Sequence, residues 1–211
     1  MLSEKVRSQL LFYRQVLRAT GQVGAFTATT RAVAEAMAAP IRRSERPLEV
    51  LEVGAGTGPL TEVIMERLGP HDRLDLVEIN PAFAAHLRRT FAGRAGGPQV
   101  EVHEQDVELL DPERRFDVIV SSLPLLNMPP EKVERVFALY MARLRPQGQL
   151  VYYDYWAKEL RTLVTPARHE RDRMERVLEV TRRFRDRHEV RKKLVLLNFP
   201  PAYVHYLRPA G

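Results

Sequence analysis

The 211-residue chain contains no cysteine. It therefore forms no disulfide, carries no thiol nucleophile and offers no cysteine ligand to a metal. Its six histidines show no metal-ligand spacing, so we expect no metal. No apolar stretch reaches the roughly 18 residues of a membrane-spanning helix, and the charges from Glu4 onward are unlike a signal peptide. These absences favour a cytoplasmic chain with one large core.

Charged side chains are segregated along the chain, although the net charge is only +6. Residues 1–46 carry eight basic and three acidic side chains, and residues 158–193 carry 13 basic and seven acidic ones. Residues 47–157 between them carry 11 basic and 17 acidic side chains. This asymmetry favours a polyanionic partner, either nucleic acid or an anionic membrane surface. Solvated helix faces are the alternative interpretation.

A glycine-rich turn follows the first predicted strand. The apolar run at residues 48–53 predicts a buried parallel strand, after which come Gly54, Gly56 and Gly58. Glycines let the backbone turn sharply and approach a ligand that a Cβ atom would block. With Glu52 ahead of it, this pattern resembles the acid-x-Gly-x-Gly-x-Gly signature of class I S-adenosylmethionine (SAM) methyltransferases. A dinucleotide-binding dehydrogenase is the rival interpretation, and a turn needed only for packing is a third.

Alternating periodicities predict an α/β fold. The predicted strands are residues 48–53, 74–78, 100–103, 116–121, 149–155, 194–198 and 202–207. The predicted helices are residues 3–18, 28–38 with Thr27 or Thr29 as N-cap, 60–68, 81–91, 130–144 and 170–187. The last two strands are too close for a parallel crossover and must be antiparallel. The order resembles the seven-stranded, Rossmann-like class I methyltransferase sheet, with N-terminal helices in residues 1–46 and the methyltransferase domain in residues 47–211.

Polar residues are predicted at the carboxyl ends of several strands, where open α/β sheets bind ligands. The resemblance to class I methyltransferases implies that Glu78 accepts hydrogen bonds from the ribose hydroxyls and Asp106 from the adenine amino group, and that Glu52 faces the cationic methionine end. Solvated strand-end acids are the alternative for Glu78 and Asp106. The complete predicted cofactor set is Phe26, Thr27, Glu52, Gly54, Gly56, Gly58, Glu78, Ile79, Asp106, Val107 and Ser121.

The segment before the first strand carries a second resemblance. Residues 21–29, Gly-Gln-Val-Gly-Ala-Phe-Thr-Ala-Thr, loosely resemble rRNA adenine dimethyltransferases and more closely resemble bacterial phospholipid N-methyltransferases. The resemblance implies that Tyr13, Phe26 and Thr27 cover the methionine end of the cofactor. Ordinary packing is the alternative for each. The helix at residues 3–18 is basic and amphipathic, which suits a membrane interface.

Residues 121–129, Ser-Ser-Leu-Pro-Leu-Leu-Asn-Met-Pro, follow the fourth predicted strand. Amino methyltransferases place Asn/Asp-Pro-Pro-Tyr there, with acceptors that aim the lone pair of the target amine at the methyl group. Here Ser122 replaces the amide and Leu125 the aromatic ring. A flipped adenine thereby loses a stacking platform worth about 1–3 kcal/mol, whereas a small aliphatic amine still fits. This stretch and Leu-Asn-x-Pro-Pro-Ala-x-Val at residues 197–204 resemble soluble bacterial phosphatidylethanolamine N-methyltransferases.

That resemblance implies SAM-dependent methylation of phosphatidylethanolamine towards phosphatidylcholine, by a monomer associated peripherally with an anionic membrane surface at the inner face of the membrane. The implied catalytic residues are Ser122, Leu123, Pro124 and Tyr13. Candidates to bind the lipid phosphate are Arg31, Lys158, Arg161 and Arg168. The alternative is an RNA adenine N6 methyltransferase related to rRNA dimethyladenosine transferases, which explains the basic segments but not Leu125.

Overall fold

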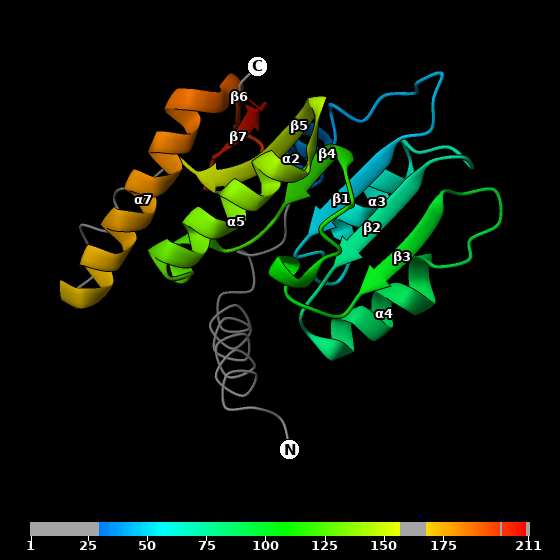
Figure 1. Ribbon diagram of the computed structural model, residues 1–211, viewed down its shortest axis with the longest axis horizontal. Coiled ribbons are helices and arrows are strands. Elements are labelled where there is room, and N and C mark those ends of the chain that lie inside the picture. The colour runs from blue at the N-terminus through cyan, green and yellow to red at the C-terminus, as the bar shows by residue number, and fades with distance from the viewer. Residues whose placement is uncertain (1–29, 157–167, 199, 210–211) are drawn as a thin grey trace.

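The computed structural model describes residues 30–156, 168–198 and 200–209 (Figure 1). These residues form one seven-stranded sheet in the order β3-β2-β1-β4-β5-β7-β6. The strands are β1 (Glu49–Val53), β2 (Arg73–Val77), β3 (Gln99–His103), β4 (Phe116–Ser121), β5 (Leu144–Tyr155), β6 (Glu189–Val195) and β7 (Ala202–Leu207). The helices are α2 (Arg31–Met37), α3 (Pro59–Met65), α4 (Pro81–Phe91), α5 (Pro130–Arg143), α7 (Arg168–His188) and the 3-10 turns η1 (Val107–Leu109) and η2 (Leu125–Asn127).

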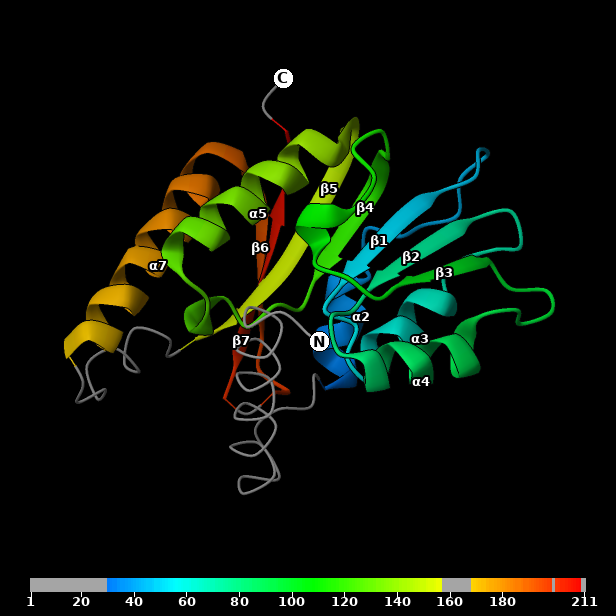
Figure 2. The same cartoon turned by 60° about the horizontal axis from the view of Figure 1, so that its bottom comes forward.

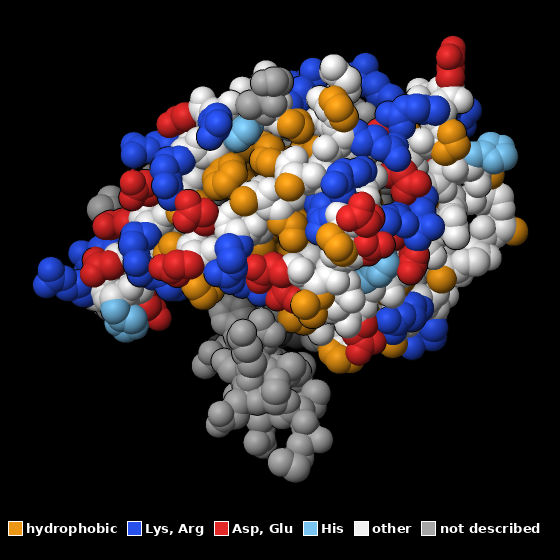
Figure 3. Space-filling model, viewed as in Figure 1, with side chains coloured by type: hydrophobic (Ala, Val, Ile, Leu, Met, Phe, Trp, Pro, Cys, Tyr) orange, Lys and Arg blue, Asp and Glu red, His pale blue; other side chains and the backbone are white. Residues whose placement is uncertain are grey.

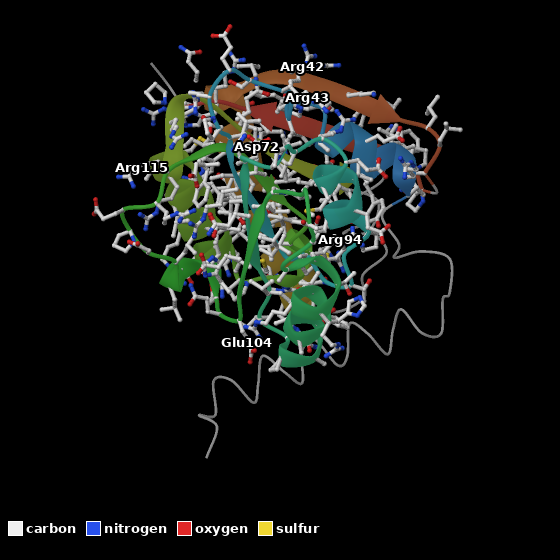
Figure 4. The ribbon with its side chains drawn as sticks, turned by 90° about the vertical axis from the view of Figure 1, so that its right-hand side faces the viewer. Arg42, Arg43, Asp72, Arg94, Glu104 and Arg115 are labelled. Carbon is white, nitrogen blue, oxygen red and sulfur yellow. The ribbon has the colours of Figure 1, made fainter. Side chains whose placement is uncertain are left out.

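Strands β1 to β5 run parallel, and β7 lies antiparallel between β5 and β6. Val53 pairs with both Val77 and Ser121, and Val77 pairs with His103, so these strands end in one row. We call this row the carboxyl edge. Figure 4 views the sheet from the β3 side, with Asp72 before β2 at one end and Glu104 after β3 at the other. The expected fold class is confirmed.

Both faces of the sheet are covered, because successive strand residues point to opposite faces. On one face Val50 and Val120 pack in a core with α2, α3 and α4. On the other, Leu51 and Ile119 pack in a core with α5 and α7 (Figure 2). This double burial explains why β1 and β4 are continuous apolar runs.

The outer surface of α5 and α7 carries basic and acidic side chains in a mixture (Figure 3). Arg176 lies 3.5 Å from Glu131, and Arg183 lies 3.1 Å from Glu134, which joins the two helices. Several arginines of the basic segment 158–193 therefore face carboxylates of the same chain. For these positions the structure favours the solvated-face interpretation over a polyanion-binding one.

Several predicted boundaries were wrong. Strand β6 occupies Glu189–Val195 rather than residues 194–198, because an edge strand needs few apolar residues and tolerates charged ones. Helix α3 ends at Met65 rather than at residue 68. Strand β5 begins at Leu144, five residues earlier than expected. Helix α2 begins at Arg31, and its N-cap is Thr30, whose hydroxyl accepts a bond from the Val33 amide.

The proposed N-terminal segment is described only from residue 30 onward, so the predicted helix at residues 3–18 lies outside the described residues. Helix α2 belongs to the core of the sheet domain: Val33 and Met37 are fully buried, and the Tyr206 hydroxyl donates a 2.7 Å bond to the Ala36 carbonyl. Among the described helices, none is both long and apolar enough to cross a membrane.

Candidate active site

The glycine turn lies at the carboxyl edge between β1 and α3. Gly54, Gly56 and Gly58 all have positive φ angles of 77°, 59° and 94°, a region that other residues enter only with strain. A Cβ atom on Gly58 would lie 2.6 Å from the Phe91 ring, so this glycine is needed for packing against α4. A Cβ atom on Gly56 would meet no atom of residues 30–156, 168–198 or 200–209 within 4 Å. Gly56 therefore faces the open side of the turn.

Glu78 follows β2 and bonds to this turn. One carboxylate oxygen accepts a 2.9 Å bond from the Gly56 amide, and the other accepts a 2.8 Å bond from the Asn80 amide. The side chain is almost fully buried, and this burial raises its pKa despite the bonds from the backbone amides. The carboxylate is thereby fixed at the mouth of the glycine turn, with lone pairs left for a further donor.

Glu52 is a buried acid just beneath the same turn, on β1. One of its oxygens accepts a 2.8 Å bond from the Thr61 hydroxyl on α3, and the other, Oε1, is buried and has no partner within the described part of the chain. Burial raises the pKa of Glu52 to about 8. A neutral carboxyl with an unused oxygen is set to ionise when a cation approaches, because the cation offsets the penalty of burial.

Asp106 lies beyond the end of β3 and caps η1. Its carboxylate accepts a 3.1 Å bond from the Glu108 amide and forms an ion pair with Lys132 of α5. The neighbouring Val107 is buried. Lys132 was not predicted, because the first turn of a solvated helix gives no sign of which carboxylate its lysine meets. Asp106 is at the expected edge, but its carboxylate also serves this ion pair.

The loop after β4 packs directly against the glycine turn. A Cβ atom on Gly54 would lie 3.2 Å from the Leu123 side chain, and the Ser122 amide donates a 2.9 Å bond to the Val53 carbonyl. The Leu125 amide donates 2.9 Å to the Leu123 carbonyl around Pro124, with φ −77° and ψ 73°, an inverse γ-turn. The predicted cofactor and reaction residues are therefore adjacent.

The hydroxyls of Ser121 and Ser122 differ in their hydrogen-bond partners. The Ser121 hydroxyl is buried and lies 3.1 Å from the Tyr140 hydroxyl of α5. The Ser122 hydroxyl is buried and has no hydrogen-bond partner among the residues that the structure describes. An unsatisfied buried hydroxyl in a native site needs an explanation, and a ligand that supplies a donor or acceptor there is one.

Helix α7 holds the far side of the same loop, which the sequence did not predict. Arg173 donates a 3.1 Å bond to the Leu126 carbonyl of η2. The many arginines of α7 gave no indication that this one turns inward. It is a positioning residue, because it fixes the loop without contacting the glycine turn.

The remaining predicted residues, which are the three expected to cover the cofactor and the four expected to bind the lipid phosphate, have different outcomes. Tyr13, Phe26, Thr27, Lys158 and Arg161 lie outside the described residues. Arg168 begins α7 and is exposed.

Arg31 forms ion pairs of 3.0 Å with Glu35 and 2.8 Å with Glu66, at the end of α3. Because α3 has seven residues, Glu66 is about 10 Å along that helix from the glycine turn. We therefore leave Arg31 out of the site.

Part of this chain is similar in sequence to known proteins. Residues 50–148 match the sequence family described as methyltransferase domain. An ornithine lipid N-methyltransferase of Singulisphaera acidiphila is 38% identical over 102 residues, which are 47% of this chain and 53% of that one. A tRNA1(Val) (adenine(37)-N6)-methyltransferase of Cronobacter sakazakii is 30% identical over 88 residues, 41% of this chain and 35% of that one. The chain thus spans about half, or less, of these curated relatives.

Solved structures show the same fold. A Burkholderia thailandensis 1,6-didemethyltoxoflavin-N1-methyltransferase with bound S-adenosylhomocysteine has a TM-score of 0.65 at 21% identity, covering 100% of this chain and 92% of that one. The N-methyltransferase NodS of Bradyrhizobium japonicum, also with S-adenosylhomocysteine, has a TM-score of 0.60 at 18% identity, covering 86% and 89%. The class I methyltransferase fold is confirmed, and the comparisons support the expected methyltransferase activity and SAM cofactor. The dehydrogenase interpretation is not supported.

Proposed function

We propose that this protein is a SAM-dependent N-methyltransferase that methylates the primary amine of a lipid headgroup, with phosphatidylethanolamine as its substrate. The observation that carries the proposal is the contact between the glycine turn and the loop of Ser122 and Leu123. This contact brings a binding site for a nucleotide cofactor next to a binding site for an amine, at the same edge of the sheet.

The residues of the turn fit the cofactor. The open side of Gly56 leaves room for a ligand against the backbone, and the Glu78 carboxylate beside it is an acceptor for a pair of hydroxyls. The unpartnered oxygen of Glu52 suits a cationic amine. When bound, SAM supplies an electrophilic methyl group, and the chain's own residues position the amine that receives it.

The loop after β4 provides acceptors for that amine. The unpartnered Ser122 hydroxyl and the Leu123 carbonyl, which retains a second lone pair beside its bond from Leu125, lie next to Gly54. They would hold a neutral amine with its lone pair directed at the methyl group, after the ammonium proton has passed to solvent. Such alignment is the main contribution that a protein makes to an in-line displacement.

A lipid is favoured over a nucleobase at this loop. Leu125 stands where an aromatic platform would support a flat base, and the Singulisphaera acidiphila relative acts, by its name, on a lipid amine. The relatives named for adenine in tRNA keep RNA as the second candidate. It is less well supported, because the missing ring removes about 1–3 kcal/mol of stacking.

The test is mass spectrometry of lipids incubated with the protein and SAM carrying a deuterated methyl group. We expect labelled mono-, di- and trimethyl products from phosphatidylethanolamine vesicles. Label only on ornithine lipid vesicles would keep the lipid amine but change the headgroup, and label on RNA alone would refute the proposal. Ser122→Ala is expected to lower turnover about tenfold, by loss of one hydrogen bond, without changing SAM affinity.

A further inference from the structure

Among the described residues, three of the six exposed large apolar side chains gather where β5 ends and β6 turns into β7. Leu196 is 70% exposed and Leu197 is 83% exposed, both in the turn of residues 196–201, of which all but residue 199 are described. Trp156, the only tryptophan of the chain, is 58% exposed and follows β5. Its amide donates a 2.8 Å bond to the Pro201 carbonyl, which places it beside the turn. We call Trp156, Leu196, Leu197, Asn198, Pro200 and Pro201 the hairpin tip.

The backbone of the hairpin tip is suited to an apolar environment. Pro200 and Pro201 have no N–H group that would need a partner. The Pro201 carbonyl accepts the bond from Trp156, and the Pro200 carbonyl accepts a 2.7 Å bond from the Asn198 side-chain amide, which is itself buried. These bonds lower the free-energy cost of moving the turn out of water, because unsatisfied polar groups make that transfer unfavourable.

Basic side chains lie behind the tip at a matching depth. Arg191, Lys192 and Lys193 are exposed on β6. With a rise of about 3.3 Å per residue, they begin roughly 10 Å behind Leu196. An apolar surface that enters a bilayer by about 5–10 Å would bring such a basic collar to the level of anionic headgroups.

The hairpin tip and the candidate active site share one edge of the molecule. Tyr155 of β5 pairs with Ala202 of β7, and Ala202 pairs with Val195 of β6, so the turn lies at the carboxyl ends of β5 and β6. Ser121, which precedes the reaction loop, pairs with Tyr152 of the same β5 strand. In Figure 2 this turn lies at the end of the red strand opposite the C-terminus.

We propose that the hairpin tip inserts into the interface of an anionic lipid bilayer and directs the carboxyl edge towards the membrane. The inference extends the proposed function by naming the docking surface. In this orientation Leu196 and Leu197 lie among the acyl chains and Trp156 lies at the interface. The basic side chains of Arg191, Lys192 and Lys193 on β6 contact the anionic headgroups. An aromatic ring at such a boundary keeps one end apolar and its N–H group wet.

The single tryptophan makes the test direct. The full chain is mixed with vesicles of phosphatidylglycerol and phosphatidylcholine, which contain no primary amine, in the absence of SAM. We expect a blue shift of Trp156 fluorescence and strong quenching when the acyl chains are brominated near the headgroup. Protein that co-sediments with the vesicles while Trp156 stays unquenched would overturn the proposal.

Two variants and a matched control complete the experiment. Leu196→Asp combined with Leu197→Asp should weaken partitioning about 100-fold or more, since each leucine loses its apolar burial. Lys193→Gln should weaken it about fivefold, and this difference should vanish at high salt. Val190→Asp is the control: Val190 is 56% exposed on the same strand, about 20 Å from the tip, and its variant should bind as the unchanged protein does.

The outcomes separate this inference from the proposed function. If Trp156 inserts into vesicles but the protein methylates no lipid, the proposed substrate is refuted and the proposed docking surface stands. Methylation of a detergent-dispersed lipid amine without insertion would refute the docking surface alone. If the double aspartate variant binds vesicles normally but changes the chain from dimer to monomer, the tip is a self-association surface and the proposal fails.

Discussion

The two halves of the sheet end in different ways at the carboxyl edge. Buried acids lie at the ends of β1 and β2: the Glu78 carboxylate accepts a bond from the glycine turn, and the Glu52 carboxylate accepts one from Thr61 of α3. Strands β5 and β6 end in exposed apolar side chains, Trp156 and Leu196. Polar groups are thus enclosed in one half and apolar groups are exposed in the other, the reverse of what solubility alone would favour.

This difference separates two kinds of recognition. A small polar ligand binds best in a site that excludes water and contains a few charged groups in fixed positions, such as the Glu78 carboxylate. An extended apolar surface is contacted best by exposed apolar side chains, such as that of Leu197, and needs no pocket. The loop of Ser122 and Leu123, which follows β4, lies between the two halves. It is the place where a cofactor from one side and a lipid amine from the other would meet.

The largest expected effect concerns the open side of the glycine turn. Gly56→Val should weaken SAM binding by at least about 4 kcal/mol, roughly 1,000-fold, because the side chain enters the space left for the ligand. Isothermal titration calorimetry measures it. Gly96→Val is the control, since Gly96 also has a positive φ of 74° and open space around it. Normal SAM affinity in folded Gly56→Val would show that the ligand does not lie against this turn.

The next effect tests the acid at the end of β2. Glu78→Ala should weaken SAM binding by about 3 kcal/mol, through the loss of two charge-assisted hydrogen bonds to the ribose. Glu104→Ala is the matched control and should leave SAM affinity unchanged. Glu104 also follows a strand, β3, but it forms an ion pair with Arg88. Equal affinities of both variants, measured by calorimetry, would remove Glu78 from the cofactor site.

The third prediction distinguishes packing from binding within one motif. Gly58→Ala should lower the free energy of unfolding by about 2 kcal/mol more than Gly93→Ala, as measured by denaturant titration. Both glycines have positive φ angles, but only the Cβ atom at position 58 meets the Phe91 ring, at 2.6 Å. Equal losses would mean that the ring moves aside freely and that Gly58 is required for its φ angle alone.

The two halves of the sheet also differ in how well they could be predicted from the sequence. In the cofactor half, the turn, Glu52 and Glu78 were correctly placed, because a glycine motif is local and its position after a buried strand fixes its edge. In the other half, β6 was placed five residues too late. The run from Leu194 to Asn198 was predicted to be a strand, although β6 ends at Val195 and the exposed Leu196 and Leu197 lie in the turn after it.

The contacts that could not be predicted are those between distant elements. Lys132 with Asp106 and Arg173 with Leu126 join α5 and α7 to the edge of the sheet. Many arginines and lysines with the same local pattern face solvent, so periodicity cannot single out these two. Ser121 was placed at the correct strand end, but its hydroxyl turned to Tyr140, since strand-end position does not determine which face a side chain takes.

The smallest expected effect concerns the pH dependence of the buried acid. Burial raises the pKa of Glu52 from 4.5 to about 8 in the unliganded protein. A raised pKa contributes stability that is complete below the unfolded value and is lost as the pH rises through the folded one. The free energy of unfolding should therefore fall by about 1 kcal/mol between pH 7 and pH 8. Denaturant titration at the two pH values measures this.

Glu52→Gln should abolish that fall, because the amide keeps an acceptor for Thr61 and has no proton to lose. Glu104→Gln, which removes an exposed carboxylate, should retain it. Saturating SAM should also flatten the slope in the unchanged protein, since a cationic amine beside the unpartnered oxygen favours the ionised form and releases a proton on binding. If Glu52→Gln keeps the full slope, another group titrates in this range. If SAM leaves the slope unchanged, the methionine amine lies away from Glu52, and the cofactor half of the sheet holds its ligand through Glu78 and the glycine backbone alone.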